Sequence, residues 1–160
     1  MDCLRPKIQL RHFLILFATA SVGFAPSARA ALGDDASAVA AAGARLKVSV
    51  RITSASGYVV HEMALPVGTT MRQFVGKSGK VFAVTWSGLR HPDMRDVLGD
   101  HYDQYKAAVQ ARGVARRMVR LELPGIVVEL GSYLRSFWGH AYLTDLAPPD
   151  WPAGLARGAR

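Results

Sequence analysis

The chain has 160 residues, half of them hydrophobic, with a formal net charge of +8. This length suits one domain with one hydrophobic core. A single cysteine, Cys3, excludes an intrachain disulfide framework and a multi-cysteine metal site.

The first thirty residues have the three-part pattern of a secretory signal peptide. A basic region over 1–12 precedes an apolar stretch over 13–25, and Ala28 and Ala30 supply the small residues of a cleavage site. The apolar stretch is shorter than the roughly 20 residues of a membrane-spanning helix. We therefore predict cleavage between Ala30 and Ala31, export of the protein, and no transmembrane segment in the mature chain.

Removal of residues 1–30 changes the chemistry that is left. It takes away Cys3, four of the 20 basic residues and one of the 12 acidic residues, so the net charge falls from +8 to +5. A mild positive charge on an exported protein suits anionic lipid, lipopolysaccharide or acidic polysaccharide as a neighbour. The basic cluster near residues 112–120 has no interleaved aromatic residues, so we do not expect nucleic acid as a partner.

The first part of the mature chain predicts a leader and two hairpins. Residues 31–45 are Ala-rich with little to bury and predict a mobile leader or at most a short helix, so order is expected from Leu46. Apolar and polar residues alternate over 46–52, and a second strand over 58–65 completes a hairpin. The next hairpin pairs 69–75 with 81–86.

Three large side chains of that second hairpin are the predicted centre of the core. Phe82, Val84 and Trp86 alternate with smaller residues, which places them on one face of a regular strand. Each would contribute about 1.5–3 kcal/mol if fully buried.

A helix is predicted over 93–111, with Asp93 as its N-cap. Its apolar residues fall on one side and its aspartates on the other, as in an amphipathic helix. Gly99 weakens this helix by about 1 kcal/mol and is a point at which it could divide.

The last part of the chain returns to strand periodicity. Alternation over 119–123 ends at a Pro-Gly turn, and 126–130 and 133–143 form a third hairpin. The tail over 144–160 is rich in Pro and Gly. The predicted fold is therefore α+β, a single domain over 46–143. It contains a curved antiparallel sheet of about six strands in three hairpins, with one main amphipathic helix on one face. Whether the sheet stays open or closes into a small barrel is left undecided.

Several segments of the mature chain resemble one bacterial family. In chain order the matching segments are residues 31–33, 68–75, 79–88, 92–94, 98–99, 126–128 and 135–143, the last with the sequence Arg-Ser-Phe-Trp-Gly-His-Ala-Tyr-Leu. Together they resemble the exported family catalogued as domain of unknown function 2844.

This resemblance implies a secreted or periplasmic protein of a Gram-negative bacterium. The family has no assigned activity, cofactor or catalytic residue, so it implies no site. The chain departs from the family pattern at Gln73, where Glu is usual, at Leu89, where Pro is usual, and at Ser132-Tyr133, where Gly-His is usual. A role of that family histidine as a ligand or base would not pass to Tyr133.

Motifs of catalysis are absent from the sequence. There is no Gly-x-Ser-x-Gly nucleophile elbow and no phosphate-binding glycine loop. The histidines lack zinc-type spacing, so we expect no metal and no cofactor. His91, Asp93 and His101 are the nearest approach to a titratable cluster and are the candidate catalytic residues, although a solvated surface is the commoner role of such residues.

Aromatic residues are the candidate binding residues. Aromatic rings can stack on a sugar or peptide, and phenol groups can donate hydrogen bonds to it. Packing in the core is the ordinary alternative for these side chains. The candidates are Trp86, Tyr102, Tyr105, Trp138 and Tyr142.

The sequence favours a non-catalytic envelope protein that binds a partner protein or an anionic cell-surface polymer. The alternative is a hydrolase-like periplasmic enzyme that uses the His/Asp cluster near residues 91–103. A third hypothesis is an accessory protein that acts by strand addition at an exposed sheet edge.

Overall fold

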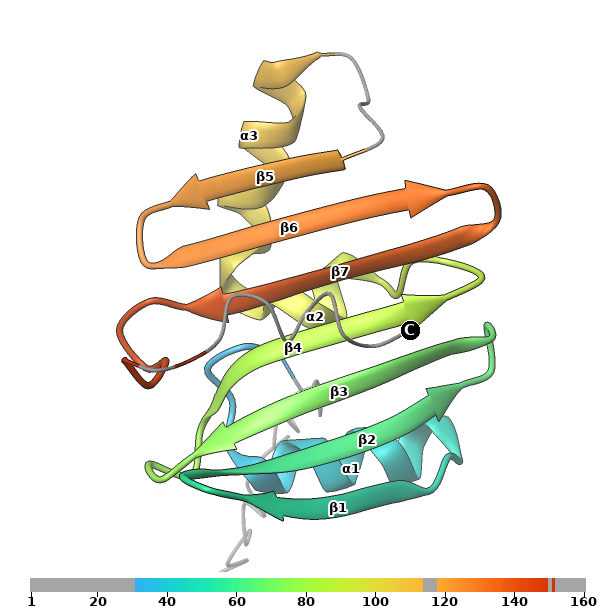
Figure 1. Ribbon diagram of the computed structural model, residues 1–160, viewed down its shortest axis with the longest axis vertical. Helices are drawn as coiled ribbons and strands as arrows, with labels where there is room; N and C mark the ends of the chain where they lie inside the picture. The colour runs from blue at the N-terminus through green and yellow to red at the C-terminus, as the bar shows by residue number, and fades with distance from the viewer. Residues whose placement is uncertain (1–30, 114–117, 150, 152–160) are drawn as a thin grey trace, which may run out of the picture.

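A seven-stranded antiparallel sheet forms the body of the computed structural model (Figure 1), which describes residues 31–113, 118–149 and 151. The spatial order is β1-β2-β3-β4-β7-β6-β5. The strands are β1 (Val50–Ala55), β2 (Tyr58–Leu65), β3 (Thr69–Gly76), β4 (Val81–Gly88), β5 (Met118–Leu123), β6 (Ile126–Tyr133) and β7 (Ser136–Leu143). The predicted α+β class is confirmed.

The sheet is open, because β1 and β5 lie at opposite edges and do not pair with each other. The barrel alternative is therefore wrong. The strand count is seven rather than about six, since β5 adds to the outer side of β6. A hairpin joins β6 to β7. Because β7 pairs with β4, the strands before and after the helices α2 and α3 form one continuous sheet.

The helices lie behind one face of this sheet in Figure 1. They are α1 (Ala36–Leu46), α2 (Met94–Leu98) and α3 (Tyr102–Arg112), with the 3-10 turn η1 (Gly99–His101) between the last two. The division of the predicted 93–111 helix falls at Gly99, as anticipated. Gly99 has φ +53°, and a Cβ on it would lie 2.7 Å from Cβ of Ala31, so glycine is required by both conformation and space.

Most of the segment for which a mobile leader or at most a short helix was predicted lies in the helix α1, and it packs on the sheet. Val39 and Ala42 of α1 are buried in the main core, and Ala31 and Leu32 before the helix are buried as well. Small residues let α1 approach the sheet closely, because a Cβ at Gly43 would overlap the Val50 side chain. The small side chains of the Ala-rich segment therefore serve close packing of α1 against the sheet.

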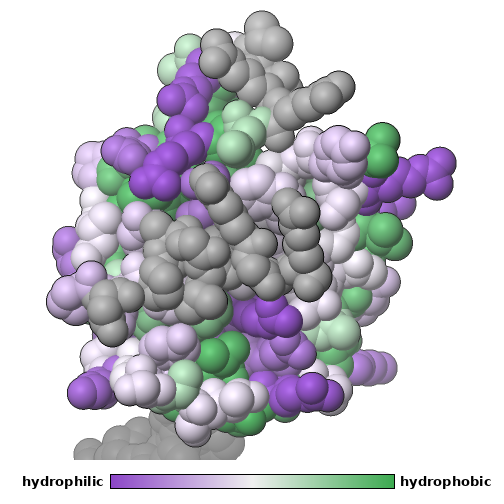
Figure 2. Space-filling model, viewed as in Figure 1, coloured by the Kyte–Doolittle hydropathy of each residue, from purple (hydrophilic) through white to green (hydrophobic). Residues whose placement is uncertain are grey.

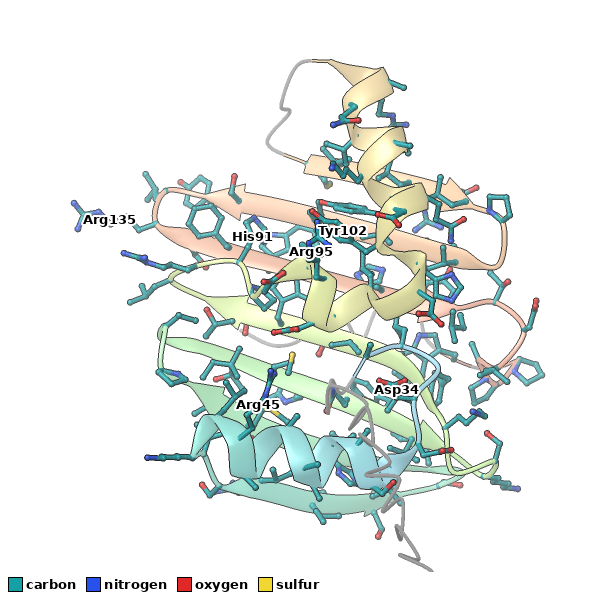
Figure 3. All side chains as sticks on the ribbon, turned by 180° about the vertical axis from the view of Figure 1, so that it is seen from behind. Asp34, Arg45, His91, Arg95, Tyr102 and Arg135 are labelled. Carbon is teal, nitrogen blue, oxygen red and sulfur yellow. The ribbon has the colours of Figure 1, made fainter. Side chains whose placement is uncertain are left out.

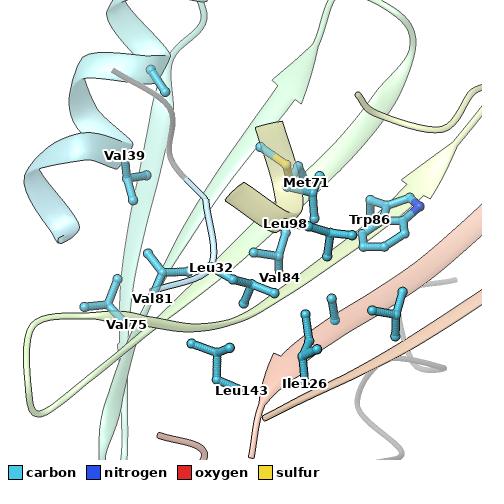
Figure 4. Packing of buried hydrophobic residues seen from close by; sticks show 14 of the residues in the cluster. Leu32, Val39, Met71, Val75, Val81, Val84, Trp86, Leu98, Ile126 and Leu143 are labelled. Carbon is cyan, nitrogen blue, oxygen red and sulfur yellow. The ribbon is translucent and has the colours of Figure 1, made fainter. Parts of the chain in front are cut away.

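The main core fills the space between the sheet and the helices (Figure 4). Its buried residues come from β2–β4, β5–β7, α1, α2 and the segment before α1. Those labelled in the close-up are Leu32, Val39, Met71, Val75, Val81, Val84, Trp86, Leu98, Ile126 and Leu143.

Phe82 does not share a face with Val84 and Trp86, contrary to the alternation in the sequence. The pairing of β3 with β4 shifts between Phe74 and Val75, so that a β-bulge turns Phe82 to the opposite face. All three side chains are buried, but Phe82 belongs to a second, smaller core with Phe74.

Two strand boundaries also differ from prediction. The first strand begins at Val50 rather than Leu46, because α1 extends to Leu46 and Lys47 adopts a left-handed conformation at its C-cap. The β6–β7 turn lies at Leu134 and Arg135 rather than at Gly131 and Ser132, because β6 extends through Tyr133.

Candidate functional site

The face of the sheet opposite the helices, here called the open face, carries one polar side chain from every strand in a single cross-strand row. Each residue of this row is the direct Cα partner of the next. From β1 to β5 the row reads Arg51, Glu62, Arg72, Thr85, His140, Glu129 and Arg120.

Ion pairs connect much of this row. Nε of Arg72 donates to Oε2 of Glu62. At the other edge, Arg120 donates to Glu122 at 2.9 Å and to Glu129 at 3.2 Å. These hydrogen bonds to carboxylates raise the pKa of the Arg120 guanidinium.

The row is buried in its middle and accessible at both edges. Thr85, His140 and Glu129 are buried, whereas Arg51 and Arg120 are exposed and Glu62 and Arg72 are half-buried. Three of these four accessible groups lie over β1–β3. Figure 2, which views this face, shows hydrophilic side chains gathered in its lower centre, over those strands.

A shallow groove of about 350 Å³ lies over the part of the row from Arg51 to Thr85. Arg and Glu carry its charge, two threonines add hydroxyl groups, and two aromatic rings add apolar surface. The lining residues are Arg51, Thr53, Tyr58, Val60, Glu62, Arg72, Phe74 and Thr85.

The second core forms the apolar end of this groove. Trp151 packs edge-on against Tyr58, Phe74 and Phe82, with ring centroids 5.7, 4.7 and 4.8 Å apart. The chain after β7 thus returns across the open face and fixes the Tyr58 ring in place. A groove lined by both aromatic rings and charged hydrogen-bonding groups suits a ligand with both apolar and hydroxyl faces.

The predicted aromatic residues do not gather in this groove. Trp86 is buried on the helix side of β4, whereas Trp138 pairs with Ser87 and lies on the open face. Each indole covers a cross-strand glycine, since a Cβ at Gly139 would overlap Trp86 and one at Gly131 would overlap Trp138. The sheet therefore separates the two tryptophans.

The three tyrosines are divided in the same way. Tyr102 and Tyr105 pack against the main core on the helix side, with ring centroids 6.3 Å apart. Burial and the neighbouring Tyr102 raise the pKa of Tyr105. Tyr142 lies on the open face, stacked on His140 at 6.1 Å.

Each predicted catalytic residue has a local structural partner. Nδ1 of His91 accepts a 3.3 Å hydrogen bond from Trp86, and its ring lies 4.8 Å from that of Phe137. Asp93 accepts from the backbone N–H of Arg95 at 2.8 Å, which confirms it as an N-cap. His101 is 2.9 Å from the Gln104 amide. Figure 3 shows His91 on the helix side, away from the open-face groove.

His61 is a buried titratable residue that the sequence did not single out. It lies beside Gln73 on the helix face of β2, and within the described chain its Nδ1 atom has no hydrogen-bond partner. Burial disfavours the charged imidazolium and lowers the pKa of His61 below its usual value of 6.5.

This lowered pKa predicts loss of stability on acidification. Below about pH 6.5 the unfolded chain binds a proton that the folded chain does not, so the free energy of unfolding falls as pH falls. When the pH is lowered from about 7.5 to 5.5, we expect the free energy of unfolding to fall less in His61→Gln than in the wild type. Urea denaturation of both proteins at the two pH values measures this difference. Burial also lowers the pKa of His91, so part of the pH dependence of stability remains in the variant. An identical pH dependence in the two proteins would contradict this assignment.

Among the described residues, no group of three or more His, Cys, Asp or Glu side chains is placed to hold a metal ion. Nor does that part of the chain contain a helix long and apolar enough to cross a membrane. Of the predicted cleavage site, Ala31 is described and Ala30 is not. Cys3 also lies outside the described residues.

Fold and site together define an α+β protein with an open antiparallel sheet, helices on one face, and a polar groove on the other. The model of the family described as Protein of unknown function (DUF2844) matches residues 28–154, so the chain belongs to this family. Neither the curated proteins nor the solved structures contain a match.

Proposed function

We propose that the protein is an exported, non-catalytic binding protein whose open-face groove holds an acidic cell-surface polysaccharide. The observation that carries the proposal is the groove itself, which is lined by Arg51, Glu62 and Arg72 and also by Tyr58. Planar charged side chains can hydrogen-bond sugar hydroxyls, and an aromatic ring offers a surface for the C–H face of a sugar. The signal-peptide pattern of residues 1–30 supports the location in the cell envelope.

Charge favours an acidic polymer over a neutral one. Glu62 is paired with Arg72, which leaves Arg51 as the additional cation of the groove lining. The groove lies beside the edge strand β1, so a long chain can enter and leave it without being cleaved or threaded.

The test is calorimetric titration of the processed protein with oligo-alginate, an acidic oligosaccharide, and with cello-oligosaccharide, a neutral one. We expect binding of the acidic probe and a five- to tenfold loss of affinity in Arg51→Ala, about the contribution of one exposed charged hydrogen bond. Lys106→Ala, which removes one positive charge from the exposed surface of α3, is the matched control. Equal affinities of the two variants, or no binding of oligo-alginate, would refute the proposal.

Strand addition at β1 is a second candidate function. Five of the six β1 side chains are exposed, the strand lies at the edge of the sheet, and it contains no proline. A peptide paired with β1 would protect its outward backbone amides from hydrogen exchange, whereas an oligosaccharide in the groove would leave them exposed.

A further inference from the structure

One end of the sheet brings together four connections, here called the loop end. They are residues 47–49 after α1, 66–68 between β2 and β3, 89–93 between β4 and α2, and 133–136 around the β6–β7 turn. Direct contacts join neighbouring loops. The backbone N–H of Leu89 donates to the Gly68 carbonyl at 3.0 Å, and the ring of His91 lies 4.8 Å from that of Phe137, next to the β6–β7 turn.

Large apolar side chains project from this end. Leu134 is 86% exposed, Tyr133 70%, Leu89 63% and Val67 44%. The loops at the opposite end of the sheet, over 56–57, 77–80, 124–125 and 144–147, include one large apolar residue of this kind, Leu146 at 37%. Exposed apolar groups collected on one end of a protein mark an interaction surface.

The backbone conformation of Leu134 is unfavourable for a leucine. It occupies the left-handed region with φ +53°, a conformation that favours Gly or Asn in a two-residue turn and disfavours a bulky side chain. The turn thus presents an exposed leucine at a position where a polar residue would be better for folding. Such a residue is more consistent with contact to an apolar partner than with a role in stability.

The charge of the loop end is mainly positive. Its four segments contain Lys47, Arg90 and Arg135 and one acidic residue, Asp93, whose carboxylate caps α2. Figure 3 shows Arg135 extending outward from the tip of the β6–β7 turn, and Figure 2 shows hydrophobic and hydrophilic side chains projecting beside one another at the same end, on the right.

We propose that the loop end docks on a lipid bilayer that contains anionic lipids. Leu134, Tyr133 and Leu89 enter the boundary between head groups and acyl chains, while Arg90 and Arg135 contact lipid phosphates. Separate apolar tips flanked by cations match a bilayer, in which apolar and anionic layers lie within a few ångströms of each other. This surface is distinct from the open-face groove, and the inference does not depend on polysaccharide binding.

The conformation at residue 134 provides a discriminating variant. Leu134→Asn removes the apolar side chain but places a residue that tolerates φ +53° in the turn, so the fold is kept. Leu146→Asn, at the opposite end of the sheet, is the matched control. Because all proteins carry the same N-terminus, a contribution of residues 1–30 cancels when variants are compared on the same vesicles.

The experiment is co-sedimentation of the full-length protein and its variants with phosphatidylcholine vesicles, with and without about 30% phosphatidylglycerol. We expect stronger binding to the anionic vesicles, about a tenfold loss in Leu134→Asn, and about a fivefold loss in Arg135→Gln. Leu146→Asn is expected to bind as the wild type does.

Three results would overturn the inference. They are equal binding to neutral and anionic vesicles, unchanged binding in Leu134→Asn, and equal losses in Leu134→Asn and Leu146→Asn. Binding of a purified protein partner through Leu134, with no vesicle binding by the wild type, would assign the loop end to protein recognition instead. Unfolding midpoints of the variants, which are expected to match that of the wild type, test whether loss of binding follows from loss of the fold.

Discussion

Phe82→Ala is expected to lower the free energy of unfolding by about 3–5 kcal/mol, the usual cost of removing a fully buried phenylalanine. The side chain has no exposed surface and joins Tyr58, Phe74 and Trp151 in the second core. Its loss leaves a cavity and removes the ring on which Trp151 packs at 4.8 Å. Urea denaturation followed by tryptophan fluorescence measures the change.

The matched control is Val109→Ala on the exposed side of α3, which is expected to cost less than about 1 kcal/mol. Because the bulge places Phe82 on the open face, Phe82→Ala is also expected to release Trp151, seen as a red shift of native-state fluorescence. A small loss of stability with unchanged native fluorescence would show that the second core is not formed as described.

Gly139→Ala is expected to be one of the most damaging single-methyl insertions in the sheet. A Cβ at this position would overlap the Trp86 ring and lie 2.8 Å from the backbone oxygen of Glu129. Trp86 is buried between the sheet and the helices, and the Glu129 backbone is fixed by pairing with β7, so neither can move freely. The expected cost is about 3 kcal/mol, at the upper end for an overpacked site.

Thermal unfolding monitored by circular dichroism tests this prediction. Ser136→Ala, an exposed position on the same strand, is the control and is expected to leave the midpoint nearly unchanged. A Gly139→Ala protein as stable as Ser136→Ala would contradict the close contact between Trp86 and β7.

Elements with strong local signals were predictable from the sequence. The period-2 patterns and Gly turns correctly indicated β2, β3 and β4, and the Asp93 cap and Gly99 correctly indicated where α2 begins and ends. In these segments the local preference and the tertiary structure agree.

The errors arose where a long-range contact decided the outcome. The bulge that turns Phe82 over depends on pairing with β3, which no local pattern reveals. The Ala-rich α1 is ordered by its fit against Val50, a contact that depends on tertiary packing. Propensity alone cannot distinguish such a helix from a mobile leader.

The site was harder to predict than the fold. The sequence identifies Arg51 and Glu62 only as polar residues on the solvent-facing side of two strands. Their alignment with Arg72 depends on the pairing registers of β1 with β2 and of β2 with β3. Histidines and tryptophans were predicted as site residues because of their chemistry, yet the sheet places Trp86 and Trp138 on opposite faces. A search for charged residues at matched positions of adjacent strands would have found the Arg51–Glu62–Arg72 row.

The most direct test of the proposed binding function is amide chemical-shift mapping of the isotopically labelled, processed protein during titration with oligo-alginate. The groove proposal predicts that the largest changes lie at Arg51, Thr53, Glu62 and Arg72, with small changes on α2 and α3. Changes centred on His91 and His101, or none across β1–β3, would contradict it.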